Sequence, residues 1–256
     1  MRCASGELNL QRPTIPITRD DITRHAFLFD FDGTLAPIAA TPEQAVVPAA
    51  TLEILEQLQS ATDGALAIVS GRPIAEIDHL LAPLQLPAAG LHGAQWRGPG
   101  SSTVTQIDLD PSPVDAMVAY LRPLVENNPG LHLEHKGLSL ALHYRNAADL
   151  QSQVIGAAEA AVQPYHDHFT LQPGKMVMEI KPRHASKAGG IERLMAVAPF
   201  SGRLAVFAGD DLTDEAGFRA VNRMGGISIK VGEGPTEAAF RLPTPAALAA
   251  WLALLV

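Results

Sequence analysis

Residues 25–38, HAFLFDFDGTLAPI, join a short apolar run to an acidic segment that contains Asp30 and Asp32. Side chains two residues apart in a strand point to the same side, so we expect these carboxylates to share one face at the end of a strand over residues 26–30. Two ionised carboxylates about 4 Å apart repel by roughly 4 kcal/mol at an effective dielectric near 20. A metal ion, a shared proton or a cationic ligand would offset this repulsion. The alternative is a solvated turn, which Asp and Gly also favour.

The bulk composition indicates a globular protein with one sizeable core, or a core with a modest second domain. The chain has 256 residues, of which 47% are hydrophobic and 18% charged. Its formal net charge of -8 argues against binding to nucleic acid or to an anionic membrane. The single cysteine, Cys3, excludes a disulfide framework within the chain and favours a reducing compartment, so a cytoplasmic location is expected.

The two ends of the chain give no sign of membrane insertion. Residues 1–24 lack an apolar stretch of signal-peptide length and are expected to form a loosely ordered arm, for which no role is predicted. Residues 246–256, AALAAWLALLV, are too short to span a bilayer. They predict a buried C-terminal helix that begins near Pro245.

Strand and helix patterns alternate at both ends of the chain. Continuous apolar runs at residues 65–69 and 204–208 are typical of strands covered on both faces, and residues 227–231, ISIKV, predict a further strand. Leucine and isoleucine recur at helical spacing in residues 51–60. This alternation predicts an α/β fold with a Rossmann-like core, in which a parallel sheet is covered by helices on both faces.

The middle of the chain predicts an inserted α+β domain over residues 109–181. Apolar and polar residues alternate in residues 138–145 and again in residues 175–181. An antiparallel sheet with helices on one face has this alternation. The core would then consist of residues 1–108 and 182–256.

Two local features mark the start of the inserted domain. Ser112 and Pro113 predict a helix with serine as its N-cap and proline as its first residue. The glycine-rich stretch RGPGSS at residues 97–102 is expected to form the hinge between the domains.

Polar side chains follow three of the apolar runs and begin one predicted helix. They are Asp30, Asp32, Ser70, Asp210 and Asp211 after the runs, and Lys187 near the helix start. Ligands bind outside the carboxyl ends of strands in open α/β sheets. Carboxylates are hard ligands that suit Mg²⁺, and an aspartate can accept a phosphoryl group. Ser70, Lys187 and loop amides would hold the phosphoryl oxygens, and Asp32 would donate a proton to the leaving oxygen.

Each element also has a simpler interpretation. Ser70 followed by glycine can be a strand-to-helix turn, Lys187 a surface lysine, and Asp210 with Asp211 a turn before a helix. A calcium loop is excluded because the glycine of the Asp-x-Asp-Gly segment comes too early and no glutamate ends the loop. Neither a Walker A pattern nor a G-x-G-x-x-G pattern occurs. The joint occurrence of the elements, in this order, favours phosphoryl transfer.

The chain resembles phosphatases of the haloacid dehalogenase superfamily in four motifs: DFDGT at 30–34, VSGR at 69–72, SKAGG at 186–190 and GDDLTDE at 209–215. The resemblance implies that Asp30 is the nucleophile and Asp32 the general acid and base. It implies that Asp30, Asp32 through its carbonyl, and Asp210 hold Mg²⁺, with support from Asp211 and Asp214. It also implies that Thr34, Gly71 and Arg72 contact the substrate, and that the inserted domain is a cap.

GLHGAQ at 90–95 and GKMVMEIKP at 174–182 make the chain similar to trehalose-6-phosphate phosphatases in particular. This resemblance implies a sugar phosphate substrate, gripped by the polar face of the cap. The implied contacts are Glu134, Lys136, His143, Arg145, Lys175 and Glu179. The alternative is that these are exposed charges on a solvated sheet face. His92 is expected to be structural or to lie behind the site.

Three other functions are compatible with the same residues. They are hydrolysis of another sugar phosphate such as sucrose phosphate, a phosphomutase, and a signalling receiver domain. A receiver domain would carry its acceptor aspartate on a later strand than its acidic pair, whereas Asp30 follows the first strand. The expected partner is a small sugar phosphate, with neither nucleic acid nor a membrane. The oligomeric state is not encoded in these patterns, and a monomer is assumed.

Overall fold

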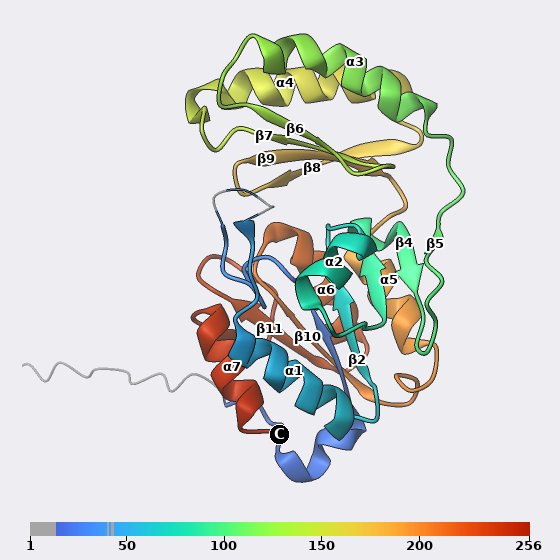
Figure 1. Ribbon diagram of the computed structural model, residues 1–256, viewed down its shortest axis with the longest axis vertical. Helices are drawn as coiled ribbons and strands as arrows, with labels where there is room; N and C mark the ends of the chain where they lie inside the picture. Colours follow the sequence, from blue (N-terminus) through green and yellow to red (C-terminus); the bar gives the residue numbers. More distant parts are fainter. Residues whose placement is uncertain (1–13, 40, 42–43) are drawn as a thin grey trace, which may run out of the picture.

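The computed structural model describes residues 14–39, 41 and 44–256. Two sheets organise the chain. A larger sheet has the strand order β12-β11-β10-β1-β2-β3-β4-β5, and a smaller sheet has the order β6-β7-β9-β8. The smaller sheet lies above one end of the larger one, with two helices on its far side (Figure 1). The predicted α/β core with an added α+β layer is confirmed.

The larger sheet is parallel from β12 to β3 and antiparallel at its β4–β5 edge. Its strands are β1 (His25–Phe29), β2 (Leu66–Val69), β3 (Ala88–Gly90), β4 (Gln95–Arg97), β5 (Thr105–Gln106), β10 (Leu204–Gly209), β11 (Ile227–Val231) and β12 (Phe240–Leu242). β1 is central, with β10 on one side and β2 on the other. The carboxyl ends of these three strands therefore meet at one edge of the sheet.

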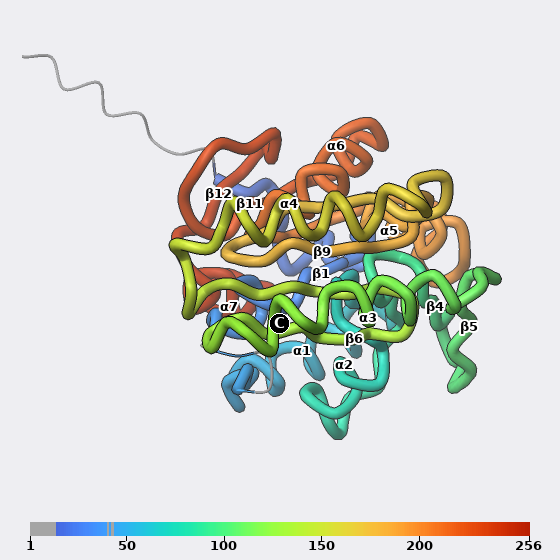
Figure 2. Tube along the Cα trace, turned by 90° about the horizontal axis from the view of Figure 1, so that it is seen from above, coloured from blue at the N-terminus to red at the C-terminus, as the bar shows by residue number. Residues whose placement is uncertain are grey.

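Helices cover both faces of the larger sheet. The helices are α1 (Ala49–Ala61), α2 (Ile74–Leu81) and α7 (Pro245–Ala253) on one face and α5 (Lys187–Met195) and α6 (Glu215–Arg223) on the other. The view from above shows the two groups on either side of β1 (Figure 2). Alternation along β1 sends Phe27 and Phe29 into the first layer and Ala26 and Leu28 into the second. Both faces are thereby buried, as the continuous apolar runs predict.

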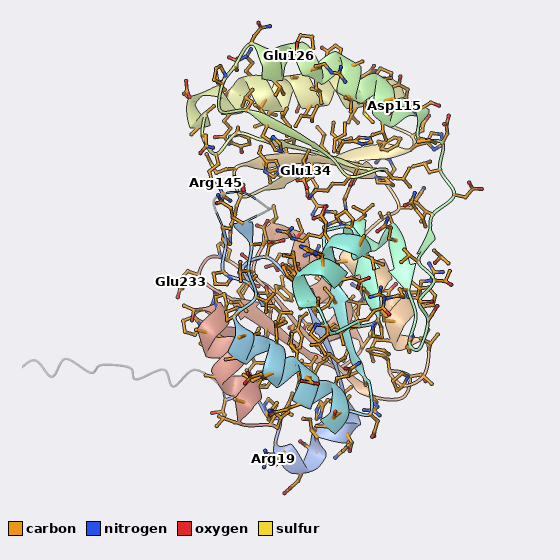
Figure 3. All side chains as sticks on the ribbon, in the orientation of Figure 1. Arg19, Asp115, Glu126, Glu134, Arg145 and Glu233 are labelled. Atoms are coloured by element: carbon orange, nitrogen blue, oxygen red, sulfur yellow. The ribbon has the colours of Figure 1, made fainter. Side chains whose placement is uncertain are left out.

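The smaller sheet is antiparallel and has one apolar face. Its strands are β6 (His132–His135), β7 (Leu140–His143), β8 (Phe169–Gly174) and β9 (Val177–Pro182). Helices α3 (Ser112–Glu126) and α4 (Gln151–Val162) pack on that face, where Leu140, Leu142, Met178 and Ile180 are buried. The opposite, polar face looks toward the core, and Glu134 lies on it (Figure 3). The division of domains at residues 108/109 and 181/182 stays a prediction.

Three local predictions are wrong. RGPGSS joins β4 to β5 within the core sheet and is therefore not the hinge. Ser112 is the first helical residue of α3, which has Pro111 as its N-cap, because the Ser112 hydroxyl bonds Asp110 and not the helix. The described part of the predicted arm, from residue 14, is ordered against the core, since Ile15, Ile17 and Ile22 are buried there. Residues 1–13 lie outside the described residues.

Across the described residues, no helix is both long enough and apolar enough to cross a membrane. The predicted C-terminal helix is confirmed as α7, which begins at Pro245 with Thr244 as its N-cap.

The close packing of α5 on β3 gives a prediction about stability. A Cβ added at Gly190 would lie 2.7 Å from the Cβ of Ala89, which cannot move aside, whereas one at Gly189 would meet only the Ser186 hydroxyl at 3.4 Å. We expect Gly190→Ala to lower the free energy of unfolding by about 1–3 kcal/mol. Gly189→Ala, the matched control on the exposed side of the same helix, should be neutral or stabilising by up to about 1 kcal/mol. Urea unfolding of both variants measures the difference, and equal effects would contradict the tight contact.

Candidate active site

Three polar side chains follow directly on the three central strands. Asp30 comes after β1, Ser70 after β2 and Asp210 after β10, and all three are buried. The backbone N–H of Asp30 donates to the carbonyl of Ala208 on β10, 2.9 Å away, which fixes where the chain leaves the sheet. The sequence prediction that these residues converge is confirmed.

The chain turns immediately after Asp30. The carbonyl of Phe31 accepts hydrogen bonds from the N–H groups of Thr34, Leu35 and Ala36, and the Phe31 ring is buried in the core. The strand therefore ends at Phe29, one residue earlier than predicted. Asp30 and Asp32 both line the cavity described below, as their expected common side requires, but they do so from a turn. The Asp32 carboxylate instead accepts two hydrogen bonds from Arg72, at 2.7 and 2.8 Å, and remains 43% exposed.

A buried lysine connects the carboxylates at the strand ends. The Nζ of Lys187 lies 2.6 Å from Oδ1 of Asp30 and 2.7 Å from Oδ1 of Asp214. The other oxygen of Asp214 accepts hydrogen bonds from the backbone N–H groups of Asp210 and Asp211. Lys187 is 3% exposed, which overturns its interpretation as a surface lysine.

The cluster of Asp30, Asp210 and Asp214 has three carboxylates, and two lysines, Lys187 and Lys175, pair with them. Burial raises the pKa of Asp30 well above its usual value, and the Asp214 carboxylate raises it further, although Lys187 opposes both. Burial likewise raises the pKa of Asp210, against the ammonium of Lys175. The predicted crowding therefore exists, but it involves Asp214 and Asp210 and not Asp32.

The cluster fits a divalent cation. Asp30, Asp210 and Asp214 each offer a carboxylate oxygen, and these atoms lie within 4.8 Å of one another. Three negative charges this close repel by roughly 3 kcal/mol for each pair at an effective dielectric near 20, and a hard cation would relieve that repulsion. Asp211 is outside this group: its carboxylate accepts from the N–H of Leu212 and caps the short helix η6 (Leu212–Asp214).

A cavity of about 260 Å³ opens above the carboxylates, between the core and the smaller sheet. This volume is near the lower end of the roughly 300–1,000 Å³ found for small-molecule sites. The predicted site residues that line it are Asp30, Asp32, Ser70, Gly71, Arg72, Glu134, Lys136, His143, Arg145, Lys175, Glu179, Lys187, Asp210 and Asp211. Thr34 is fully buried outside this lining, and its hydroxyl donates to Oδ2 of Asp30 at 3.3 Å. The expectation that Thr34 contacts substrate is therefore wrong. Asp214 is also buried beneath the cavity.

The polar face of the smaller sheet forms the upper wall of the cavity. Lys136 lies 3.3 Å from Glu134 and 3.8 Å from Glu179, and Glu134 also contacts His143 at 3.0 Å. Glu134 is drawn on this face in Figure 3, on the side toward the core. The alternative of a solvated face is therefore wrong for Glu134, Lys136 and Glu179, because these groups pair with one another in a partly enclosed space.

Two side chains of the smaller sheet bridge to the core. The Nζ of Lys175, in the β8–β9 turn, lies 2.5 Å from Oδ2 of Asp210. Arg145 donates to the carbonyl of Ala39, 2.5 Å away. Lys175 thus reaches the carboxylate cluster in this arrangement, whereas the resemblance implied a contact with sugar.

Sequence reasoning missed several cavity residues. The His132 ring lies against the His143 ring, tilted by 35° with the centroids 5.8 Å apart, and its two-residue spacing from Glu134 on β6 was an available signal. Thr213 and Asn146 also line the cavity. The buried Lys230 donates to the carbonyl of Asp210, and a lysine inside an apolar strand pattern was the signal for it.

The fold of the core is of the haloacid dehalogenase type. A solved phosphatase of that superfamily from Bacteroides thetaiotaomicron matches the fold at 15% identity with a TM-score of 0.63, over 93% of this chain and 96% of the other. The trehalose-phosphatase family profile matches residues 28–246. The chain belongs to this family.

Individual relatives agree with the family assignment. The trehalose-6-phosphate phosphatase of Escherichia coli (strain K12) is 43% identical over 232 residues, which cover 91% of this chain and 86% of the relative. A probable trehalose-phosphate phosphatase of Sinorhizobium fredii is 37% identical and covers 98% of this chain and 95% of the relative. A crystal structure of a trehalose-6-phosphate phosphatase related protein has a TM-score of 0.77 at 28% identity, covering 90% of this chain and 96% of the other.

The pairing of Glu179 predicts an acid-dependent loss of stability. Burial alone would raise the pKa of Glu179, but His92, Lys136 and Lys187 outweigh it and lower that pKa to about 2. A carboxyl group with a lowered folded-state pKa stabilises the fold above its unfolded pKa, near 4.3, and loses this contribution as the pH falls. Between pH 5.5 and 3.5, the free energy of unfolding should therefore fall by roughly 1 kcal/mol more in the wild type than in Glu179→Gln.

Denaturant unfolding across this pH range tests the prediction. Glu53→Gln, which removes an exposed carboxylate on α1, is the control and should follow the wild type. Parallel curves for the wild type and Glu179→Gln would contradict the strong pairing of Glu179.

Proposed function

We propose that this chain is a Mg²⁺-dependent phosphatase that hydrolyses trehalose 6-phosphate to trehalose and phosphate. The observation that carries the proposal is the cavity, which has a buried carboxylate cluster as its floor and a network of paired charges as its upper wall. Membership of the trehalose-phosphatase family and the names of its relatives support the substrate. The cytoplasmic location and monomeric state stay predictions.

Asp30, Asp210 and Asp214 are the carboxylates that would hold Mg²⁺, together with the carbonyl of Asp32, while Asp211 would support the loop. When bound, the ion would neutralise charge on the phosphoryl oxygens and on the carboxylates. Neutralisation matters for Asp30 in particular, because a nucleophile must be ionised and the surroundings of Asp30 raise its pKa.

In the first step, an oxygen of Asp30 attacks phosphorus and the bond to the sugar oxygen breaks. Asp32 donates a proton to that oxygen, which leaves as trehalose. Lys187 and Ser70, both lining the cavity, would stabilise the charge that spreads over the phosphoryl oxygens. Arg72 holds the Asp32 carboxylate in an ion pair at the edge of the site, so Asp32 would leave Arg72 and take up a proton before it acts as the acid.

In the second step, water attacks the phosphorus of the aspartyl-phosphate. Asp32 accepts the proton of the water, the bond between phosphorus and the Asp30 oxygen breaks, and phosphate leaves. Thr34 has a positioning role in both steps, because its buried hydroxyl donates to Oδ2 of Asp30 and limits rotation of that carboxylate.

The upper wall suits a neutral disaccharide. Trehalose presents many hydroxyl groups, and a site for it needs paired donors and acceptors that become unsatisfied with a poorer substrate. Glu134, Lys136 and Glu179 supply such groups and already hold one another in place. Lys175 and Arg145 contribute by joining the cap to the core, which would exclude water during the first step.

Phosphate release from several sugar phosphates tests both substrate and metal. We expect rapid release from trehalose 6-phosphate, loss of release on chelation, and restoration by Mg²⁺. Glucose 6-phosphate and sucrose 6-phosphate should be hydrolysed at least about tenfold less efficiently, since they leave polar groups of the upper wall unpaired.

Asp30→Asn is the control for the core chemistry and should show no release while retaining the wild-type circular dichroism spectrum. Equal release from all three esters would contradict recognition by the cap. Release that survives exhaustive chelation would contradict the metal requirement. A sugar phosphate product in place of free phosphate would indicate a phosphomutase.

A further inference from the structure

His92 lies at the point where the core meets the smaller sheet. It belongs to the short helix η3 (Leu91–Gly93), which follows β3, and its ring is 3% exposed. Its Nε2 lies 2.8 Å from Oε2 of Glu179 on β9. This contact connects the core to the network of the upper wall, because the other oxygen of Glu179 faces Lys136.

The backbone around His92 is held in an uncommon conformation. Leu91 and His92 have φ values of 48° and 55°, in the left-handed region that costs non-glycine residues about 1 kcal/mol or more each. Two hydrogen bonds maintain it: the His92 N–H donates to the Ser70 carbonyl and the Leu91 N–H to the Arg72 carbonyl. The loop that carries Ser70 and Arg72 therefore fixes the direction of the imidazole.

The segment that carries Gly71 packs closely against the His92 ring. A Cβ at Gly71 would lie 2.7 Å from Nε2 of His92, so this position accepts only glycine while the ring contacts Glu179. Burial lowers the pKa of His92, together with Lys187 and Lys181 and against the opposing Glu179 carboxylate, so the ring is neutral near pH 7. A neutral ring carries one N–H, and the Glu179 carboxylate favours it at Nε2. The 2.8 Å approach of Nε2 to Oε2 is not aligned as a hydrogen bond in this arrangement, and both ring nitrogens are buried without a hydrogen-bond partner among the described residues.

Among the described residues, side chains at Lys175, Arg145 and Glu179 reach from the smaller sheet to the core beside the cavity, and these contacts differ in burial. Lys175 is 51% exposed and Arg145 is also exposed, whereas His92 and Glu179 are both largely enclosed. The attraction between a polar group and a charged group gains strength where water is excluded. The contact between His92 and Glu179 is therefore the one best able to fix the upper wall above the catalytic floor.

We propose that His92 is a positioning residue that holds Glu179, and through it Lys136, in place for the sugar when the cap is closed on the core. His92 itself touches neither phosphorus nor the metal in this role. His92 belongs to the core and Glu179 to the smaller sheet, so the ring can contact Glu179 only when the cap is closed on the core. Sugar recognition would therefore depend on cap closure. The inference rests on the proposed function, since it concerns recognition of the same substrate.

Two variants of His92 separate positioning from a general structural role. In His92→Asn, the side chain tolerates the left-handed backbone but is too short to reach Glu179. In His92→Gln, the amide nitrogen is as many bonds from Cα as Nε2 is, so it restores a donor at that place. Each variant is assayed with trehalose 6-phosphate and with p-nitrophenyl phosphate, a small ester that does not need the sugar wall.

We expect His92→Asn to lower kcat/KM for trehalose 6-phosphate about 10- to 100-fold, chiefly through KM. The loss with p-nitrophenyl phosphate should be at least about tenfold smaller, and His92→Gln should recover a substantial part of the loss. In a double-mutant cycle, the effects of His92→Asn and Glu179→Gln should be far from additive.

Other outcomes overturn the inference. Equal losses on both esters, without recovery in His92→Gln, would show that His92 supports only the core fold. Unchanged kinetics with trehalose 6-phosphate, or additive effects in the cycle, would show that the contact does not serve recognition. A wild-type enzyme that hydrolyses p-nitrophenyl phosphate but not trehalose 6-phosphate would instead contradict the proposed function.

Discussion

One ammonium group, that of Lys187, joins the segments on which the site depends. It bridges Asp30 after β1 and Asp214 after β10, while the other oxygen of Asp214 holds the backbone of Asp210 and Asp211. Without this bridge, three carboxylates would face one another in a buried space. The parallel order β10-β1-β2 brings these groups together, and the close packing of α5 on β3 at Gly190 sets the position of the lysine. The core thus holds three mutually repelling carboxylates close together, and this same arrangement makes the site suitable for a divalent cation.

The smaller sheet completes the site from above. Its apolar face is covered by α3 and α4, so only its polar face is free to meet a ligand. The charged side chains on that face contact one another. They pair in a chain that runs from His143 through Glu134 and Lys136 to Glu179. Such a wall is organised before the substrate arrives, which lowers the entropic cost of binding a flexible disaccharide. Contacts with the core at His92, Lys175 and Arg145 tie this wall to the chemistry below it.

The sequence was sufficient to predict those parts of the site that follow from local patterns. An apolar run that ends in a polar residue predicts both a strand and the place of its last side chain, which succeeded for Asp30, Ser70 and Asp210. Alternation along β7 and β9 predicted which face of the cap is polar. Contacts between distant segments could not be predicted from the sequence. Asp32 pairs with Arg72 because the strand ends at Phe29 and the chain turns there. Lys175 contacts Asp210 because of the position of the cap on the core. The role of Thr34 depends on a hydroxyl direction that spacing alone does not specify.

Chemical trapping of the phosphoryl group tests the central claim, which is that Asp30 attacks phosphorus, most directly. In Asp32→Asn, p-nitrophenolate can leave without an acid, whereas the second step lacks its base, so the intermediate should accumulate. Borohydride reduction of the acid-quenched protein converts an aspartyl-phosphate to homoserine, which peptide mass spectrometry locates. We predict a burst of about one p-nitrophenolate per enzyme and homoserine at position 30. Homoserine at another aspartate, or a burst without any modified residue, would contradict it.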